Sequence, residues 1–216
     1  MVAGSIPAGV AKFERPAIPI LTLLPWDDAG LGLLRAMNTP EQKQHLGGVE
    51  TEAKLAERQG RYLTYHRPGE TEMLRIAADG EIVGSICYWE TERDGAPAYE
   101  TGWEVLPAHH GRGLGVAAAR ALLDRLRPLA RHRYVFAFPT PDNPGSNGIC
   151  RKLGFELLGV EDTEYPTGVW SPHNVWRLDL RPAAIEPRLT GRTRPGPPPA
   201  ASRSPSSPAR TARATC

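Results

Sequence analysis

A glycine-rich segment constrains the fold of this chain more than any other part of it, and it reads His110-Gly111-Arg112-Gly113-Leu114-Gly115. It follows a stretch with strand character at 99–106 and precedes one with helix character at 116–126. Closely spaced glycines permit positive φ and a close approach of the backbone to a ligand. The first turn of a helix presents unpaired N–H groups and a partial positive charge to an anion. The segment therefore predicts a phosphate cradle that suits a nucleotide-type pyrophosphate.

The residues around this loop decide between the known nucleotide-binding motifs. A P-loop requires Lys and then Ser or Thr after its last glycine, whereas Val116 and Ala117 stand there. A dinucleotide fingerprint would open its domain and carry an acidic residue about 20 positions later. Here a long segment precedes the loop, and the later stretch is the apolar run 134–138. Both motifs are therefore excluded.

A second motif, Asn143-Pro144-Gly145-Ser146-Asn147-Gly148-Ile149-Cys150-Arg151-Lys152-Leu153-Gly154-Phe155, indicates a short helix with signals at both ends. Asn143 is a favourable N-cap, and Pro144 is a favoured first helical residue. Gly154 suits the left-handed position after the helix, and Phe155 can fold back onto the last turn. The motif follows the glycine loop at about the 30-residue spacing that a β-α-β crossover unit requires.

Together the two motifs resemble those of the GNAT superfamily of N-acetyltransferases. The loop is similar to the family's Arg/Gln-x-x-Gly-x-Gly/Ala acyl-CoA loop, with His110 at the first position. The second motif is similar to the family's Asn-x-x-Ser-x-x-x-Tyr-x-x-x-Gly-Phe signature, with Cys150 at the tyrosine. The resemblance implies an α/β (α+β) fold with a mixed, mostly antiparallel sheet of about seven strands, a parallel β-α-β acyl-CoA unit and helices on both faces.

Local patterns along the chain fit this order of elements. Strands are predicted at 18–24, 73–77, 81–90, 99–106, 134–138, 155–160 and 174–180, and longer helices at 27–37, 51–64 and 116–126. Asp79-Gly80 predicts a hairpin between the second and third strands. The strands at 99–106 and 134–138, with the helix between them, predict a right-handed crossover with parallel strands, which binds ligands beyond its carboxyl ends.

Composition divides the chain into three parts. Residues 183–216 contain seven prolines, six arginines and one glutamate, and with so few large apolar side chains they cannot offset the entropy of ordering. We expect a disordered tail at 183–216, a flexible lead at 1–16 and an N-acetyltransferase domain at 17–182. Subtracting the tail's net charge of +5 from the chain's +2 leaves −3 for the remainder, which argues against a nucleic-acid partner.

The cysteines and the apolar runs bear on compartment. Cys87, Cys150 and Cys216 have neither metal-ligand nor disulfide spacing. Residues 1–17 contain no apolar core of signal-peptide length, and no stretch approaches the ~20 apolar residues of a membrane span. We therefore expect a cytoplasmic protein, a monomer or homodimer, with no metal and no membrane contact.

The resemblance also implies how acetyl-CoA, the expected co-substrate, is held. Backbone groups before the loop would hold pantetheine and polarise the thioester carbonyl, and the loop amides would hold the pyrophosphate. Arg112 would either add a charge-assisted contact or point into solvent. The residues expected to bind the coenzyme are Val105, Leu106, His110, Gly111, Arg112, Gly113, Leu114, Gly115, Val116, Asn143 and Ser146.

Acetyl transfer to an amine demands above all that the amine be neutral. With an amine pKa of about 10.4, only about one molecule in 10³ is neutral near pH 7, so a base or a desolvating pocket must supply the difference. The chain is most similar to the branch that acetylates N-termini of ribosomal proteins, which implies Ser146 as the acid and Glu164, one residue out of register, as the base. Glu104, on one strand face with Glu100, is the alternative base, and a water or pocket mechanism is the third. Ser146 has the alternative role of a helix hydroxyl bonded to the backbone.

These observations predict transfer of acetyl from acetyl-CoA to a primary amine by direct attack in a ternary complex, because no thiol nucleophile beside a base is visible. Acidic residues expected at the cleft mouth favour a cationic acceptor such as a protein N-terminus, a polyamine or an amino-sugar. These acidic residues are Glu90, Glu92, Glu161, Asp162 and Glu164. The alternative is a non-catalytic acyl-CoA-binding or sensing module, which Cys150 in place of tyrosine favours.

Overall fold

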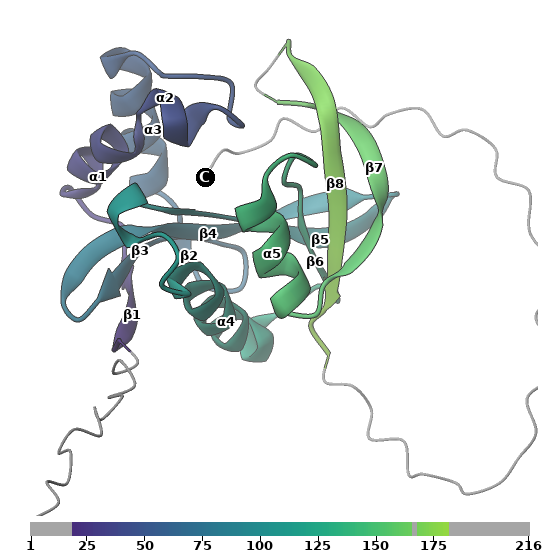
Figure 1. Ribbon diagram of the computed structural model, residues 1–216. Helices are drawn as coiled ribbons and strands as arrows, with labels where there is room; N and C mark the ends of the chain where they lie inside the picture. The colour runs from purple at the N-terminus through teal and green to yellow at the C-terminus, as the bar shows by residue number, and fades with distance from the viewer. Residues whose placement is uncertain (1–18, 166–167, 182–216) are drawn as a thin grey trace, which may run out of the picture.

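The computed structural model describes residues 19–165 and 168–181. The expected flexible lead at 1–16 and disordered tail at 183–216 lie outside these residues. The described elements, in chain order, are β1 (Leu21–Pro25), α1 (Gly30–Met37), α2 (Pro40–Lys43), α3 (Glu52–Leu63), β2 (His66–Arg67), β3 (Thr71–Ala78), β4 (Glu81–Arg93), β5 (Ala96–Val105), η1 (Pro107–His109), α4 (Leu114–Leu126), η2 (Arg127–Leu129), β6 (Tyr134–Ala137), α5 (Pro144–Lys152), β7 (Glu156–Glu164) and β8 (Trp170–Asp179) (Figure 1).

The strands form one mixed sheet in the order β1-β3-β4-β5-β6-β8-β7, with the two-residue β2 added beside β3. Neighbouring strands are antiparallel, except that β5 and β6 are parallel and are joined through α4. The predicted fold class and the predicted β-α-β unit are thus confirmed. None of the described helices is long and apolar enough to cross a membrane.

Helices cover both faces of the sheet, as expected (Figure 1). On one face α4 buries a stripe of Ala118, Leu122 and Leu126 in the larger core cluster. On the other face α1 and α3 form a second cluster, in which Met37 and Tyr62 are each only 1% exposed. Burial of this apolar surface, at about 25 cal/mol per Å², is the main force that holds the helices against the sheet.

Short-range signals in the sequence fix the ends of several elements. The Thr51 hydroxyl accepts a hydrogen bond from the Lys54 N–H at the start of α3, and the Asn143 amide oxygen accepts one from the Ser146 N–H at the start of α5. Gly154 ends α5 with a φ of +80°. Asp79, with Gly80, forms the predicted turn between β3 and β4.

The parallel strands β5 and β6 separate soon after they meet. Among the described residues they pair only through Tyr99 with Val135 and Glu100 with Phe136. Beyond these two pairs β5 continues to Val105 along β4 alone. β4 and β5 approach closely at Gly84, which has no side chain. A Cβ at this position would lie only 2.2 Å from the Glu104 carbonyl oxygen. The divergence opens the sheet at its centre.

A buried amide holds α5 against β8 beside this opening. Asn147 is 1% exposed, and its Oδ1 accepts hydrogen bonds from Asn174 Nδ2 at 2.7 Å and from Trp176 Nε1 at 2.8 Å. Its Nδ2 donates to the carbonyl oxygens of Thr140 and Asn143 at 2.9 and 2.7 Å. The amide thus pairs with two buried side-chain donors and with two carbonyl acceptors at the edge of the opening.

Replacing Asn147 by Leu is expected to lower the free energy of unfolding by about 2–4 kcal/mol, because the side-chain N–H groups of Asn174 and Trp176 stay buried and lose this hydrogen bond. Urea denaturation followed by circular dichroism would measure the loss. Gln44→Leu, which replaces an exposed side-chain amide by the same residue, serves as the control. It should change the free energy of unfolding by no more than roughly 0.5 kcal/mol. Equal effects at the two positions would contradict the structural role of Asn147.

Candidate active site

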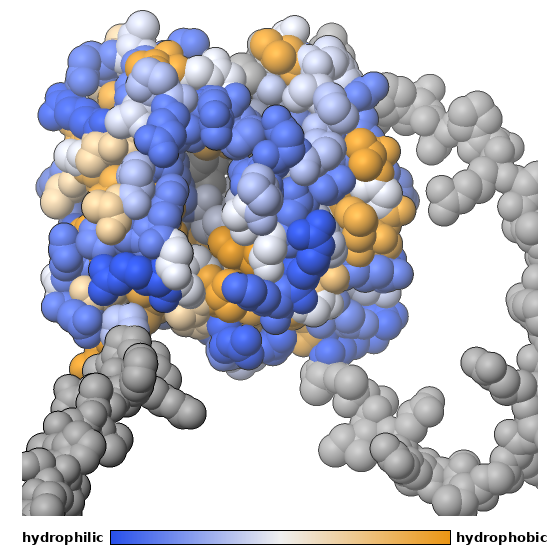
Figure 2. All heavy atoms as spheres, in the orientation of Figure 1, coloured by the Kyte–Doolittle hydropathy of each residue, from blue (hydrophilic) through white to orange (hydrophobic). Residues whose placement is uncertain are grey.

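A cleft of about 680 Å³ lies where β5 and β6 diverge. Its wall combines the second half of β5, the glycine loop, the start of α5, the segment around α2 and parts of the β6–α5 and β7–β8 connections. Figure 2 shows a hollow in the middle of this face, with mainly hydrophilic residues around its rim. Thus the cleft brings together the two motifs found in the sequence.

The glycine loop has the geometry of an anion cradle. Gly111 and Gly113 have φ values of +75° and +77°, in the left-handed region that favours glycine. Gly113 is the N-cap of α4 without any side-chain cap, and the first turn of α4 contains no acidic residue. The first N–H groups of this 13-residue helix are therefore open to an anionic ligand.

The other residues expected to bind the coenzyme fall into two groups. Val105, His110, Gly111, Gly113, Leu114, Gly115, Val116, Asn143 and Ser146 all line the cleft, whereas Leu106 and Arg112 do not. The Leu106 N–H donates to the Val83 carbonyl at 2.8 Å. The guanidinium of Arg112 instead contacts the His109 ring, with 3.1 Å between Nη1 and Nδ1. The coenzyme role of all eleven residues stays a prediction.

His110 stands where the family has arginine or glutamine, and its ring folds back onto the end of β5. The ring Nε2 lies 2.7 Å from the Val105 carbonyl oxygen. That carbonyl also accepts a hydrogen bond from Gln42 Nε2 at 3.2 Å. His110 thus fastens the loop to the strand, while its neighbours present their backbone to the cleft.

The beginnings of α4 and α5 face the same cleft. A Cβ on Gly115 would come within 2.7 Å of the Ile149 Cδ1 atom, so the absence of a side chain at Gly115 allows the two helices to approach. Ser146, in the first turn of α5, lines the cleft, and its backbone N–H is the group bonded to Asn143. Two positive helix ends therefore converge on one cavity.

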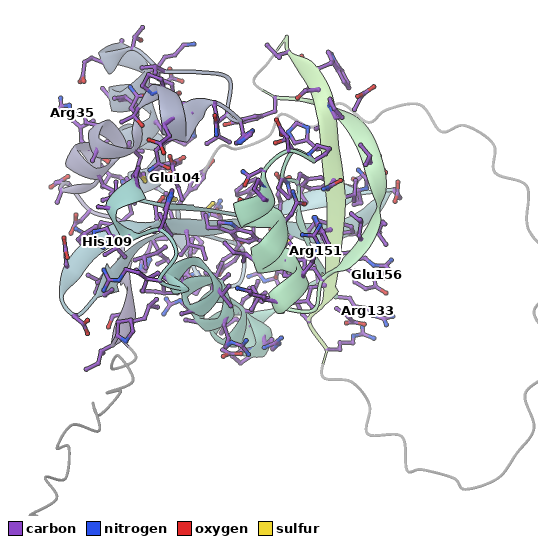
Figure 3. All side chains as sticks on the ribbon, in the orientation of Figure 1. Arg35, Glu104, His109, Arg133, Arg151 and Glu156 are labelled. Carbon is purple, nitrogen blue, oxygen red and sulfur yellow. The ribbon has the colours of Figure 1, made fainter. Side chains whose placement is uncertain are left out.

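Glu104 is a carboxylate buried in the cleft wall, with 7% of its side chain exposed. Both of its carboxylate oxygens lie 2.8 Å from Lys43 Nζ. Burial raises the pKa of Glu104 above its usual range, and the charge and hydrogen bond of Lys43 offset part of that rise. Figure 3 shows Glu104 on the side of the sheet that faces the N-terminal helices.

Glu164, the other predicted base, lies away from this carboxylate. It is the last residue of β7, is exposed, and accepts a hydrogen bond from the Gly168 N–H at 2.8 Å. It is not among the residues that line the cleft, although its neighbour Tyr165 is. The structure therefore brings Glu104 and Ser146 into one cleft and leaves Glu164 outside it.

Cys150, at the position of the family's tyrosine, is fully buried. Burial raises the pKa of its thiol to about 12. A thiol in this environment is a poor nucleophile and a poor acid near neutral pH. This agrees with the expectation of direct attack rather than a covalent acetyl-cysteine.

Two side chains of this site were not identified from the sequence. Lys43 and Gln42 belong to the four-residue helix α2 and contact Glu104 and Val105, about 60 residues later in the chain. The one local signal for α2 is Thr39 followed by Pro40, in which the threonine hydroxyl accepts a hydrogen bond from the Gln42 N–H. That signal predicts the start of a helical turn, but it does not predict that the turn contacts the end of β5.

Comparisons with known proteins agree with this geometry. The model of the acetyltransferase (GNAT) domain matches residues 20–156. An L-methionine sulfoximine/L-methionine sulfone acetyltransferase of Pseudomonas aeruginosa is 31% identical over 141 residues, which cover 64% of this chain and 81% of that protein.

Solved structures show the same fold. A ribosomal L7/L12 alpha-N-protein acetyltransferase in complex with coenzyme A superimposes with a TM-score of 0.62 at 19% identity, over 74% of this chain and 93% of the other. A putative acetyltransferase from Salmonella typhimurium with acetyl-CoA superimposes with a TM-score of 0.57 at 22% identity, over 78% of this chain and 99% of the other.

The family match supports an enzyme over the non-catalytic module considered from the sequence, since the curated relatives are named acetyltransferases. It also supports acetyl-CoA as the co-substrate. With the family model covering more than half of the chain and the cleft built from the motifs that this family uses, the chain belongs to the GNAT acetyltransferases and is an acetyl-CoA-dependent N-acetyltransferase.

Proposed function

We propose that this enzyme acetylates a primary amine whose surroundings are neutral or cationic, such as a protein N-terminus or a small polyamine, with Glu104 as the general base. The observation that carries the proposal is the buried Glu104 carboxylate in the wall of the cleft, one residue before the strand end at Val105. Acetyl-CoA would lie along the glycine loop and the start of α5. The remaining wall would then receive the acceptor.

The proposed reaction begins with the amine close to Glu104. The carboxylate takes a proton from the ammonium form, and the neutral nitrogen attacks the thioester carbonyl carbon to form a C–N bond. Because burial raises the pKa of Glu104, this carboxylate is a stronger base than one exposed to water.

Collapse of the tetrahedral intermediate breaks the C–S bond and releases the thiolate of coenzyme A. Ser146 lies in the cleft wall on the side of the expected coenzyme and is the proposed proton donor to that thiolate. The thiolate has a pKa near ~8.5 and therefore needs a proton less urgently than the amine needs a base. The acylated nitrogen still carries one proton too many for an amide, and that proton would return through water to the Ser146 oxygen. Glu104 would release its proton to solvent before the next turnover.

The charges on the acceptor side favour a substrate without a carboxylate. The part of the cleft wall that lies outside the glycine loop and α5 contains the residues that we call the acceptor half. They are Glu41, Gln42, Gln44, His45, Leu46, Trp89, Glu100, Glu104, Phe138, Tyr165 and His173. Three of them are acidic, of which Glu104 is paired with Lys43. Among the described lining residues the one lysine or arginine is Lys152, at the end of α5 and outside this half. The acidic residues expected at the mouth, Glu90, Glu92, Glu161, Asp162 and Glu164, are not part of the lining. An acceptor carboxylate bound in this half would lie near Glu41 and Glu100, with no lysine or arginine of the same half to pair with it.

The acceptor class proposed from this charge pattern differs from the substrates named for the Pseudomonas relative, which are amino acids with a carboxylate. We expect kcat/KM to be at least tenfold higher for L-methionine amide than for L-methionine or L-methionine sulfoximine, which corresponds to about 1.4 kcal/mol. The values must be expressed per neutral amine, because the amide and the free acid differ in amine pKa. Release of the coenzyme A thiol, followed with a thiol reagent, measures turnover.

A short peptide with a free N-terminus and a diamine complete the panel, with the N-terminally blocked peptide as control. Turnover of the free peptide or of the diamine, but not of the blocked peptide, would support the proposal. Preference for L-methionine sulfoximine over every carboxylate-free amine would overturn the proposed acceptor class and point to the substrate of the relative.

A further inference from the structure

The Lys43–Glu104 pair is the most deeply buried ion pair among the described residues. The side chains are 3% and 7% exposed, and Nζ lies 2.8 Å from each carboxylate oxygen. Because the Lys43 ammonium contacts both oxygens, it restrains the orientation of the Glu104 carboxylate plane. A pair this deeply buried carries a large desolvation penalty, so it offers little net stability in return for its cost.

The two partners differ in their relation to the cleft. Glu104 lines the cleft, whereas Lys43 does not, although Gln42 and Gln44 on either side of it do. Lys43 therefore contacts the carboxylate from behind the wall and leaves the cleft side open. An acceptor amine can approach Glu104 without displacing Lys43.

The helix α2 is attached to the end of β5 at two successive residues. Lys43 binds the Glu104 carboxylate, and Gln42 donates to the Val105 carbonyl oxygen at 3.2 Å. Thr39 caps the start of the same helix. The orientation of Glu104 is thus set by a short element that comes from another part of the chain.

From these contacts we infer that Lys43 is a positioning residue for the reaction, which keeps Glu104 ionised and directed into the cleft so that it can accept the proton of the acceptor amine. This inference rests on the proposed role of Glu104 as the base. A buried carboxylate without a cation would retain a proton to higher pH and could not act as a base until it lost that proton.

Other charges around Glu104 do not replace Lys43. Arg58 from α3 and Glu50 from the segment before α3 act on Glu104 with opposite signs. They are paired with each other, with 2.6 Å between Arg58 Nη2 and Glu50 Oε1. On the neighbouring strand β4, the residue opposite Glu104 is the uncharged Ser85. Lys43 is thus the cation in direct contact with the carboxylate.

The test is the pH dependence of kcat at saturating acetyl-CoA and acceptor. Lys43→Met is expected to move the acid limb upward by about one pH unit or more, so that kcat below the limb falls at least tenfold. Lys43→Arg, which keeps the charge, should restore most of the wild-type limb. The exposed Lys54→Met carries the same chemical change on α3 and should match the wild type.

Two controls make the outcome decisive. Circular dichroism and acetyl-CoA titration establish that each variant folds, and Lys43→Gln, which retains a hydrogen-bond donor without charge, replaces Lys43→Met if the latter does not fold. A wild-type limb in the uncharged variants, together with loss of turnover in Glu104→Gln, would overturn the role of Lys43 alone. Full turnover in Glu104→Gln would overturn the proposed base itself.

Discussion

Replacing Glu104 by Gln is expected to lower kcat by roughly 100-fold or more, the usual contribution of a general base, while the affinity for acetyl-CoA stays unchanged. Glutamine has nearly the shape of glutamate but cannot take the proton of an ammonium group. The coenzyme contacts expected from the glycine loop and α5 do not involve this side chain. Steady-state kinetics and calorimetric titration of acetyl-CoA measure the two quantities.

Glu164→Gln provides the matched control, because it is the same change on a carboxylate outside the cleft lining. We expect its kcat to stay within about twofold of the wild type, as for a surface substitution. Since Glu104→Gln leaves the Lys43 ammonium without its counter-charge, a thermal unfolding curve must show that the variant is folded at the assay temperature. Loss of turnover in Glu164→Gln alone would assign the base to the end of β7.

The glycine loop yields the second large effect. Gly113→Ala is expected to weaken acetyl-CoA binding at least tenfold, which corresponds to about 1.4 kcal/mol. Gly113 has a φ of +77° and is the N-cap of α4. An alanine there is strained by about 1–2 kcal/mol, and relief of that strain turns the first N–H groups of α4 away from the pyrophosphate position.

Gly95→Ala is the matched control for this change. Gly95 lies in the β4–β5 turn with a φ of +75°, and a Cβ would meet no atom within 4 Å at either glycine. Both variants should therefore lose similar free energy of unfolding, whereas only Gly113→Ala should lose affinity in a titration with acetyl-CoA. Equal affinity in the two variants would show that the loop does not hold the coenzyme.

Features that depend on neighbouring residues could be predicted from the sequence. The caps at Thr51 and Asn143, the turn at Asp79 and the end of α5 at Gly154 each follow from local hydrogen bonds or from positive φ. The parallel β-α-β unit followed in the same way from two strand-like stretches with one helix between them. The fold class was predicted from the resemblance of the two motifs to the GNAT superfamily, and these local features fitted that order of elements.

Features that depend on distant contacts could not be predicted. The helix α2 has only four residues, which is too short for periodicity to indicate it. Its role comes from the contact of Lys43 with Glu104, 61 residues away. The choice between Glu104 and Glu164 likewise depended on which strand end borders the cleft. That depends on where β5 and β6 separate, and the pattern of apolar residues does not show it.

The early separation of β5 and β6 also has a consequence for the protein before it meets its coenzyme. The side of β5 beyond Glu100 that faces away from β4 is an edge inside the sheet, and unpaired strand edges are templates for association with other chains. The cleft that makes room for acetyl-CoA thus adds an inner strand edge to the two outer edges of the sheet, which β1 and β7 form. A coenzyme that lay along β5 would cover this inner edge and take the place of the missing strand partner.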